Sequence, residues 1–164
     1  MLKAMGIVTN ATASLQAILA GESGLAWALS ENDPVIGGGA KAGDIRLENI
    51  ALDVAEKSPQ RYPSVSIYCE RFTNTQREKF SVVSGTLTAA IEIRASGNSV
   101  AAVSEQTSGY AAAIMKVLDC HKGEWTAGIQ YCGGYDVAFQ QIKRGGTQLI
   151  QVTKITVPLQ VIQR

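Results

Sequence analysis

Three residue types that can bind metals or take part in catalysis stand side by side at Asp119, Cys120 and His121, and His121 is the only histidine. A zinc site needs several such ligands that converge on one point. Neighbouring residues of a helix point in different directions, and these three end a predicted helix. A histidine at a helix C-terminus is also favoured by the helix dipole. We therefore predict a helix end here and no metal site.

Thiol catalysis would need a nucleophile, a base and an orienting group. The base could only be His121, and folding would have to bring Cys69 or Cys132 to it. Three widely spaced cysteines do not form a disulfide framework, and buried, reduced thiols of a cytosolic protein fit better. The glycine run 37–39, followed by Lys41, lacks the Ser or Thr of a phosphate-binding loop. We predict no catalytic residues, no cofactor and no enzyme.

Two basic groups are the other candidates for function. Arg71, Arg77 and Lys79 flank a polar connection, and Lys143 and Arg144 precede a glycine turn. Such cations at loop tips keep a protein soluble, or they contact a phosphate backbone or an acidic neighbour. The formal net charge of +1 lacks the basic excess that is typical of duplex-binding domains. The five residues are therefore candidate contacts to a partner.

The elements that position these residues follow from hydrophobic patterning. The stretch 78–94 alternates, which predicts one long strand with a dry face and a wet face. Its dry positions are Val83, Leu87, Ala89, Ile91 and Ile93, and its wet positions are Ser84, Thr86, Thr88, Glu92 and Arg94. Residues 64–70 alternate as well, so the two strands are expected to form a long antiparallel hairpin.

After this hairpin, one apolar stripe of three- and four-residue steps predicts an amphipathic helix over 100–120, capped by Ser99. Further strands are expected at 125–131, 136–142 and 149–157, with Pro158 at the end of the last one. The fold class is α+β, a mostly antiparallel sheet with the amphipathic helix covering one face. We expect a single domain over residues 1–164.

The N-terminal part is less regular. A helix is predicted over 12–20, and 22–44 is predicted to be an irregular, glycine-rich arm. The stretch 45–56 suits a helix or a strand, and we favour a strand in its second half. The arm is too apolar for a free linker, which suggests that it packs on another subunit through Trp27, Leu29, Val35 and Ile36.

Composition supports a folded chain with partners. Hydrophobic residues make up 46% and charged residues only 18%, and interface cores are depleted of charge. No run of about eighteen apolar residues predicts a membrane span, and the first residues do not suggest a secretory signal.

The order of these elements resembles the tail terminator and related neck, or head–tail joining, proteins of long-tailed bacteriophages. The resemblance covers about 63–161: Pro-Ser-Val-Ser-Ile-Tyr at 63–68, the long strand 80–94, the helix containing Ala-Ala-Ala-Ile-Met-Lys-Val-Leu at 111–118, and the final apolar strand. It rests on a pattern of elements rather than on a motif, and it does not explain the arm at 22–44.

The resemblance implies a structural virion protein that forms a homo-oligomeric ring, usually of six copies. Such a ring caps the tail tube, joins it to the head connector or stopper protein, and passes genomic DNA without reading its sequence. It would assemble in the host cytoplasm, with no membrane, catalysis or cofactor. In a ring, a strand edge near 149–157 and the arm with Trp27 would meet, and Arg71, Arg77 or Lys143 would line the lumen.

Two alternatives stay open. The chain could be another tail or neck subunit, such as a tube or baseplate protein, which would stack into a polymer instead of closing one ring. It could also be a small cytosolic ligand-binding domain or enzyme that uses a pocket between helix and sheet. A monomeric mass and a saturable ligand would favour this last alternative.

Overall fold

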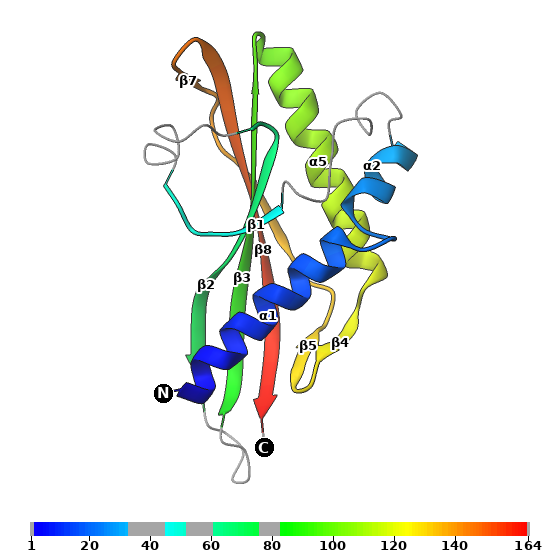
Figure 1. Cartoon of the computed structure of the whole chain (residues 1–164), viewed down its shortest axis with the longest axis vertical. Coiled ribbons are helices and arrows are strands. Elements are labelled where there is room, and N and C mark those ends of the chain that lie inside the picture. The colour runs from blue at the N-terminus through cyan, green and yellow to red at the C-terminus, as the bar shows by residue number, and fades with distance from the viewer. Residues whose placement is uncertain (1, 33–44, 52–60, 76–82, 164) are drawn as a thin grey trace.

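The computed structural model describes residues 2–32, 45–51, 61–75 and 83–163. The fold is α+β, as the sequence predicts (Figure 1). In chain order the elements are α1 (Leu2–Ala20), α2 (Leu25–Asn32), β1 (Ile45–Leu47), β2 (Ser64–Asn74), β3 (Val83–Gly97), α5 (Val100–Cys120), β4 (Gly123–Thr126), β5 (Ile129–Tyr131), β6 (Asp136–Phe139), β7 (Lys143–Gly145) and β8 (Gln148–Gln163).

All strands belong to one sheet of mixed type. Its order is β1-β2-β3-β8-β5-β4, and β6 and β7 also pair with β8. Among the described strands, only β1 and β2 pair in parallel. β3 pairs antiparallel with β2 and, along its whole length, with β8. The polar connection predicted at Arg71–Arg77 is wrong as far as Asn74, because β2 continues to that residue, and 76–82 lies outside the described residues.

The helices cover one face of this sheet. The dry positions predicted for β3, namely Val83, Leu87, Ala89, Ile91 and Ile93, are all buried. α5 packs on β3 and β8, and α1 packs on β1, β2 and β3, crossing the sheet diagonally in Figure 1. The Ser99 hydroxyl accepts a hydrogen bond from the Ala102 amide at 3.2 Å, which confirms the predicted cap of α5.

α1 is ten residues longer than predicted, because it begins at Leu2 instead of Thr12. Thr12 does not cap a helix start: its hydroxyl donates to the carbonyls of Val8 and Thr9 within the helix. The buried side chains follow four-residue steps at Ile7, Ala11, Leu15 and Leu19. Packing of this stripe outweighs the low helix propensity of the residues from Gly6 to Asn10.

The prediction of an irregular arm over 22–44 is wrong at Leu25–Asn32, which forms helix α2 and packs on α5. Leu25, Ala28 and Leu29 are buried at three- and four-residue steps, which a helix can place on one side. The rest of the arm, 33–44, lies outside the described residues. In the ambiguous stretch 45–56 the strand is at the start, Ile45–Leu47, and 52–56 lies outside the described residues.

β8 also differs from expectation. The predicted exposed edge near 149–157 is wrong, because β3 occupies one side of β8 while β7 and β6 occupy the other. Pro158 does not end the strand, which continues to Gln163. It lies between the residues that pair with β6 and those that pair with β5, so neither of these strands needs its missing N–H.

Within the described ranges, no helix is long and apolar enough to cross a bilayer.

Candidate functional site

The sheet face opposite the helices carries a network of polar side chains, which we name the polar sheet face. The strand register puts these residues on the same side: Ser64, Ser66 and Tyr68 of β2, Glu92 and Arg94 of β3, and Lys154 of β8. The sequence predicted a solvated face here. That prediction is wrong at Arg94, whose side chain is only 3% exposed.

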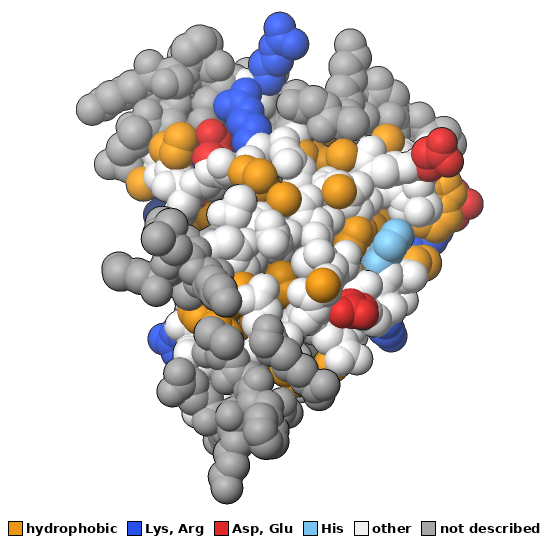
Figure 2. Space-filling model, turned by 60° about the horizontal axis from the view of Figure 1, so that its bottom comes forward, with side chains coloured by type: hydrophobic (Ala, Val, Ile, Leu, Met, Phe, Trp, Pro, Cys, Tyr) orange, Lys and Arg blue, Asp and Glu red, His pale blue; other side chains and the backbone are white. Residues whose placement is uncertain are grey.

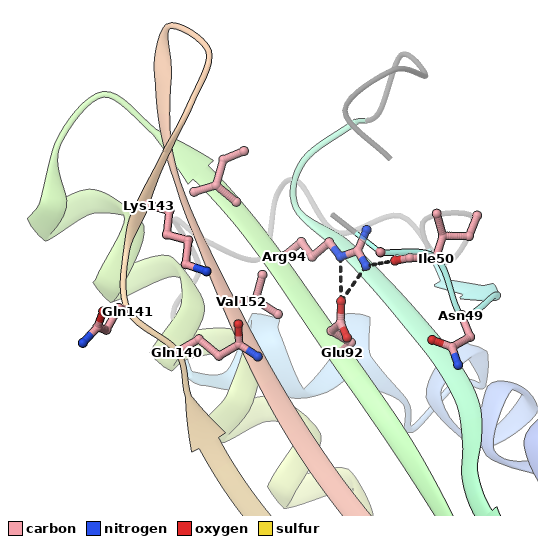
Figure 3. A pocket seen from close by; sticks show the side chains of 10 residues that line it. Asn49, Ile50, Glu92, Arg94, Gln140, Gln141, Lys143 and Val152 are labelled. Atoms are coloured by element: carbon pink, nitrogen blue, oxygen red, sulfur yellow. Dashed lines mark hydrogen bonds and ion pairs between the residues drawn. The ribbon is translucent and has the colours of Figure 1, made fainter. Parts of the chain in front are cut away.

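Arg94 is buried because two partners satisfy its guanidinium. Its Nε donates to Oε1 of Glu92 at 2.7 Å, and its Nη2 donates to the backbone carbonyl of Ile50. Ile50 belongs to the segment that leaves β1, so this arginine fastens that segment onto the sheet (Figure 3). An ion pair with full hydrogen bonding is the form in which a buried charge is tolerated.

Tyr68 and Lys154 of the polar sheet face also have partners. The Tyr68 hydroxyl donates to Oε2 of Glu92 at 3.2 Å. Burial and, next, the negative charge of Glu92 raise the pKa of Tyr68 to about 12, so the phenol stays protonated as a donor. Lys154 forms an ion pair with Glu70 across the strands. Around Glu92 and Lys154 this face therefore carries neutralised charges, while Arg71 and Asp136 are exposed on it towards its two edges.

At one end of this face is a hollow of about 260 Å³. In Figure 3, Glu92 and Arg94 lie on one side of it, and Gln140 and Lys143 lie on the other. The described residues that line it are mainly amides and apolar side chains, with Lys143 and with the carboxylate of Glu92 that Arg94 holds. This lining can hydrogen-bond a polar group.

The structure does not gather the predicted basic residues at one place. Arg71 is exposed on β2 at the level of Thr88, and Lys143 is exposed on β7 at the level of Ser96. Thr88 and Ser96 are eight residues apart along β3 (96 − 88), which separates the two basic residues by about 26 Å in the strand direction. Arg144 is exposed beside Lys143, whereas Arg77 and Lys79 lie outside the described residues.

Trp27 and Leu29, which the sequence predicts to contact a neighbouring subunit, instead pack within their own chain. Leu29 is 1% exposed and belongs to the chain's own core, so it is not available to a neighbour. Trp27 packs beside that core, and Nζ of Lys116 on α5 lies 4.7 Å from its ring centroid. Lys116 also pairs with Glu31. Val35 and Ile36 lie outside the described residues.

His121 ends α5, as predicted. Its amide donates to the Leu118 carbonyl at 3.1 Å, and its Nδ1 lies 2.7 Å from the Val117 carbonyl. Because a carbonyl only accepts hydrogen bonds, Nδ1 carries the proton. Within the described residues there is no group of three side chains suited to a metal ion.

The cysteines are less buried than predicted. Cys120 and Cys132 are exposed, and Cys69 is half-buried at the edge of β2. Burial raises the pKa of the Cys69 thiol, so that thiol is a poorer nucleophile than an ordinary one.

Several strand edges are open among the described residues: the outer edges of β1, β4 and β7, which are three-residue or four-residue strands, and two further edges on β2 and β6. β1 covers β2 only at Val65–Ile67, so no described strand pairs with the outer edge of Tyr68–Thr73. On the other side of the sheet, β6 pairs with β8 through one edge, and no described strand occupies its second edge. Phe139 at the end of β6 is 54% exposed.

The described surface is also sparsely charged. Figure 2 shows one face on which hydrophobic side chains are scattered among uncharged ones, with most charged side chains near its rim. Such a composition suits a surface that partners cover.

The chain matches no model of a known protein family, and no curated protein is significantly similar to it. Functional conclusions therefore depend on the fold, the polar sheet face and the open edges.

Proposed function

We propose that this protein is a structural subunit of a long-tailed bacteriophage particle that closes into a ring at the end of the tail tube, in the manner of a tail terminator. The arrangement of elements is the main support. The antiparallel pair β2–β3 and the returning strand β8 belong to one sheet. The N-terminal helix α1 and the long helix α5 pack on one face of this sheet. The stretch 63–161 that carries the sequence resemblance contains most of this sheet.

The polar sheet face fits the inner wall of such a ring. A channel that passes DNA should present polar groups without a strong excess of positive charge, which would hold the phosphate backbone. Glu92 and Glu70 neutralise Arg94 and Lys154 on this face. Uncharged hydroxyls and amides such as Thr86 and Gln160 lie on the same side of β3 and β8. DNA would slide over this surface without being bound to it.

In this role the protein caps the growing tube, ends its polymerisation and offers its opposite rim to the head connector or stopper protein. Six copies are implied by the resemblance alone, so the copy number of the ring is a quantity to measure. No step of this role needs a bond to be made or broken.

The test is the mass and shape of the purified protein. Light scattering over a range of concentrations, followed by negative-stain imaging, should show single closed rings with a central hole. Stacks of indefinite length would instead support a tube subunit. A protein that stays monomeric at every concentration and binds a small molecule in the hollow would overturn the proposal in favour of a ligand-binding domain.

A further inference from the structure

Among the open edges of the described strands, those of β2 and β6 lie at opposite ends of one sheet, which is the geometry that a head-to-tail contact between copies requires. One edge is the outer side of Tyr68–Thr73 on β2, and the other is the free side of β6. When two copies join through two different patches, the pair still has one free patch of each kind. Further copies can therefore add until a ring closes. An edge that meets its own kind would stop at a dimer.

The side chains of the two edges match on both sides of the sheet. On the helix side, β2 offers Phe72, which is opposite Leu87 of β3, and β6 offers Val137, which is opposite Ile155 of β8. Both side chains are half-buried against the core. On the polar sheet face, β2 offers Arg71 and β6 offers Asp136, and both are exposed. Joining the edges would thus continue the apolar side and bring opposite charges together.

From these observations we infer that β6 of one copy pairs with the Arg71–Thr73 edge of β2 in the next copy, an inference that rests on the ring proposed above. The bulge between Cys69 and Arg71 limits regular pairing to this part of β2. With Phe72 opposite Val137, Arg71 is opposite Ala138 and diagonal to Asp136. A diagonal cross-strand neighbour is within reach of a long side chain such as arginine.

The strand directions allow this pairing. β2 and β8 both run antiparallel to β3, and β6 runs antiparallel to β8, so β6 and β2 point in opposite directions. A copy rotated about an axis along the strands keeps these directions, and its β6 meets β2 as an antiparallel partner. The β8 residues that pair with β6 are opposite residues 90–93 of β3, whereas Arg71–Thr73 is opposite residues 86–88 of β3. The copies must therefore be staggered along the strands, as strands are when a sheet closes on itself.

Charge reversal tests the pairing in solution. Arg71→Asp and Asp136→Arg should each raise the concentration for half-assembly by about tenfold or more, because each sets like charges against each other. The double variant, which exchanges the charges, should restore assembly to within about threefold of the wild type. Lys122→Asp is the matched control for Arg71→Asp, since it makes the same change in net charge at an exposed residue outside β2 and β6, and it should have no effect.

A cross-link tests the register directly. In a background with Cys69→Ala, Cys120→Ser and Cys132→Ser, the pair Arg71→Cys and Ala138→Cys should give a disulfide between copies under mild oxidation. The pair Arg71→Cys and Gln130→Cys should not, because Gln130 is on β5, which β4 and β8 flank. Wild-type rings with unaffected reversal variants and no cross-link would overturn the edge pairing and leave the ring proposal intact. A wild-type chain that never assembles would overturn both.

Discussion

Arg94 and Glu92 lie two residues apart on β3, on the same side of the sheet, and Nη2 of Arg94 is 2.6 Å from Oε1 of Glu92. The arginine is almost fully buried, and the carboxylate accepts from the Tyr68 hydroxyl as well. This pair therefore joins three parts of the chain: β3, β2 and the segment after β1 that carries Ile50. It is the most deeply buried ion pair among the described residues.

The first prediction concerns this pair. Arg94→Met should lower the free energy of unfolding by about 3 kcal/mol, because it leaves the Glu92 carboxylate and the Ile50 carbonyl without their donor. Lys154→Met is the matched control: its ion pair with Glu70 is more exposed, so the loss should stay below about 1 kcal/mol. Urea denaturation of both variants measures the difference. Equal losses would contradict a special role for Arg94.

The second prediction concerns alkaline pH. The pKa of Tyr68 is raised from 10.0 to about 12 in the folded protein, by burial first and then by Glu92. The folded state thus favours the neutral phenol, and this contribution is complete below pH 10 and is lost as the pH rises towards 12. Tyr68→Phe should show a shallower loss of stability over this range than the wild type. Denaturation curves at several alkaline pH values provide the measurement, and identical slopes would contradict it.

The third prediction concerns the turn between β4 and β5. Gly128 has φ +79°, and a Cβ there would lie 2.2 Å from the carbonyl oxygen of Ile162. Gly146 has φ +64° with open space around it. Gly146→Ala should cost about 1 kcal/mol from backbone strain alone, while Gly128→Ala should cost at least about 2 kcal/mol more. Thermal unfolding of the two variants measures these losses of stability. Similar losses would argue against the close approach of Gly128 to the Ile162 carbonyl of β8.

The fourth prediction separates the two roles considered for α2. If Trp27 serves its own chain, Trp27→Ala should destabilise each subunit by about 2–3 kcal/mol through lost packing and the lost contact with Lys116. The mass of the assembled protein should stay the same. Light scattering together with denaturation checks this expectation. A variant of normal stability that no longer assembles would instead place Trp27 between subunits.

The central strands and α5 could be predicted from the sequence because their patterns are long and clear. The alternation from Val83 to Ile93 specifies the buried face of β3, and the apolar stripe from Val103 to Leu118 specifies that of α5. Val100 was included in that stripe and is 60% exposed, since it lies at the first turn, before the helix meets the sheet.

The tertiary arrangement decided the features that the sequence analysis missed. Nothing local shows that Arg94, at a predicted solvated position, is covered by the segment that carries Ile50. Whether an edge is open depends on which strands pair, and the alternation of β8 alone does not show that β6 and β7 occupy the side opposite β3. A charged pair at alternate positions of a long strand, such as Glu92 and Arg94, is the signal that could have pointed to the polar network.

β8 pairs with β3, β5, β6 and β7, and it follows all four in the chain. During translation, none of these strands can find that partner until residues 148–163 have left the ribosome. The sheet should therefore be completed late and cooperatively, at the slower rate that distant contacts impose. Until then the edge of β3 that β8 will occupy is unpaired in the nascent polypeptide, which makes this interval the one in which a chaperone would protect it.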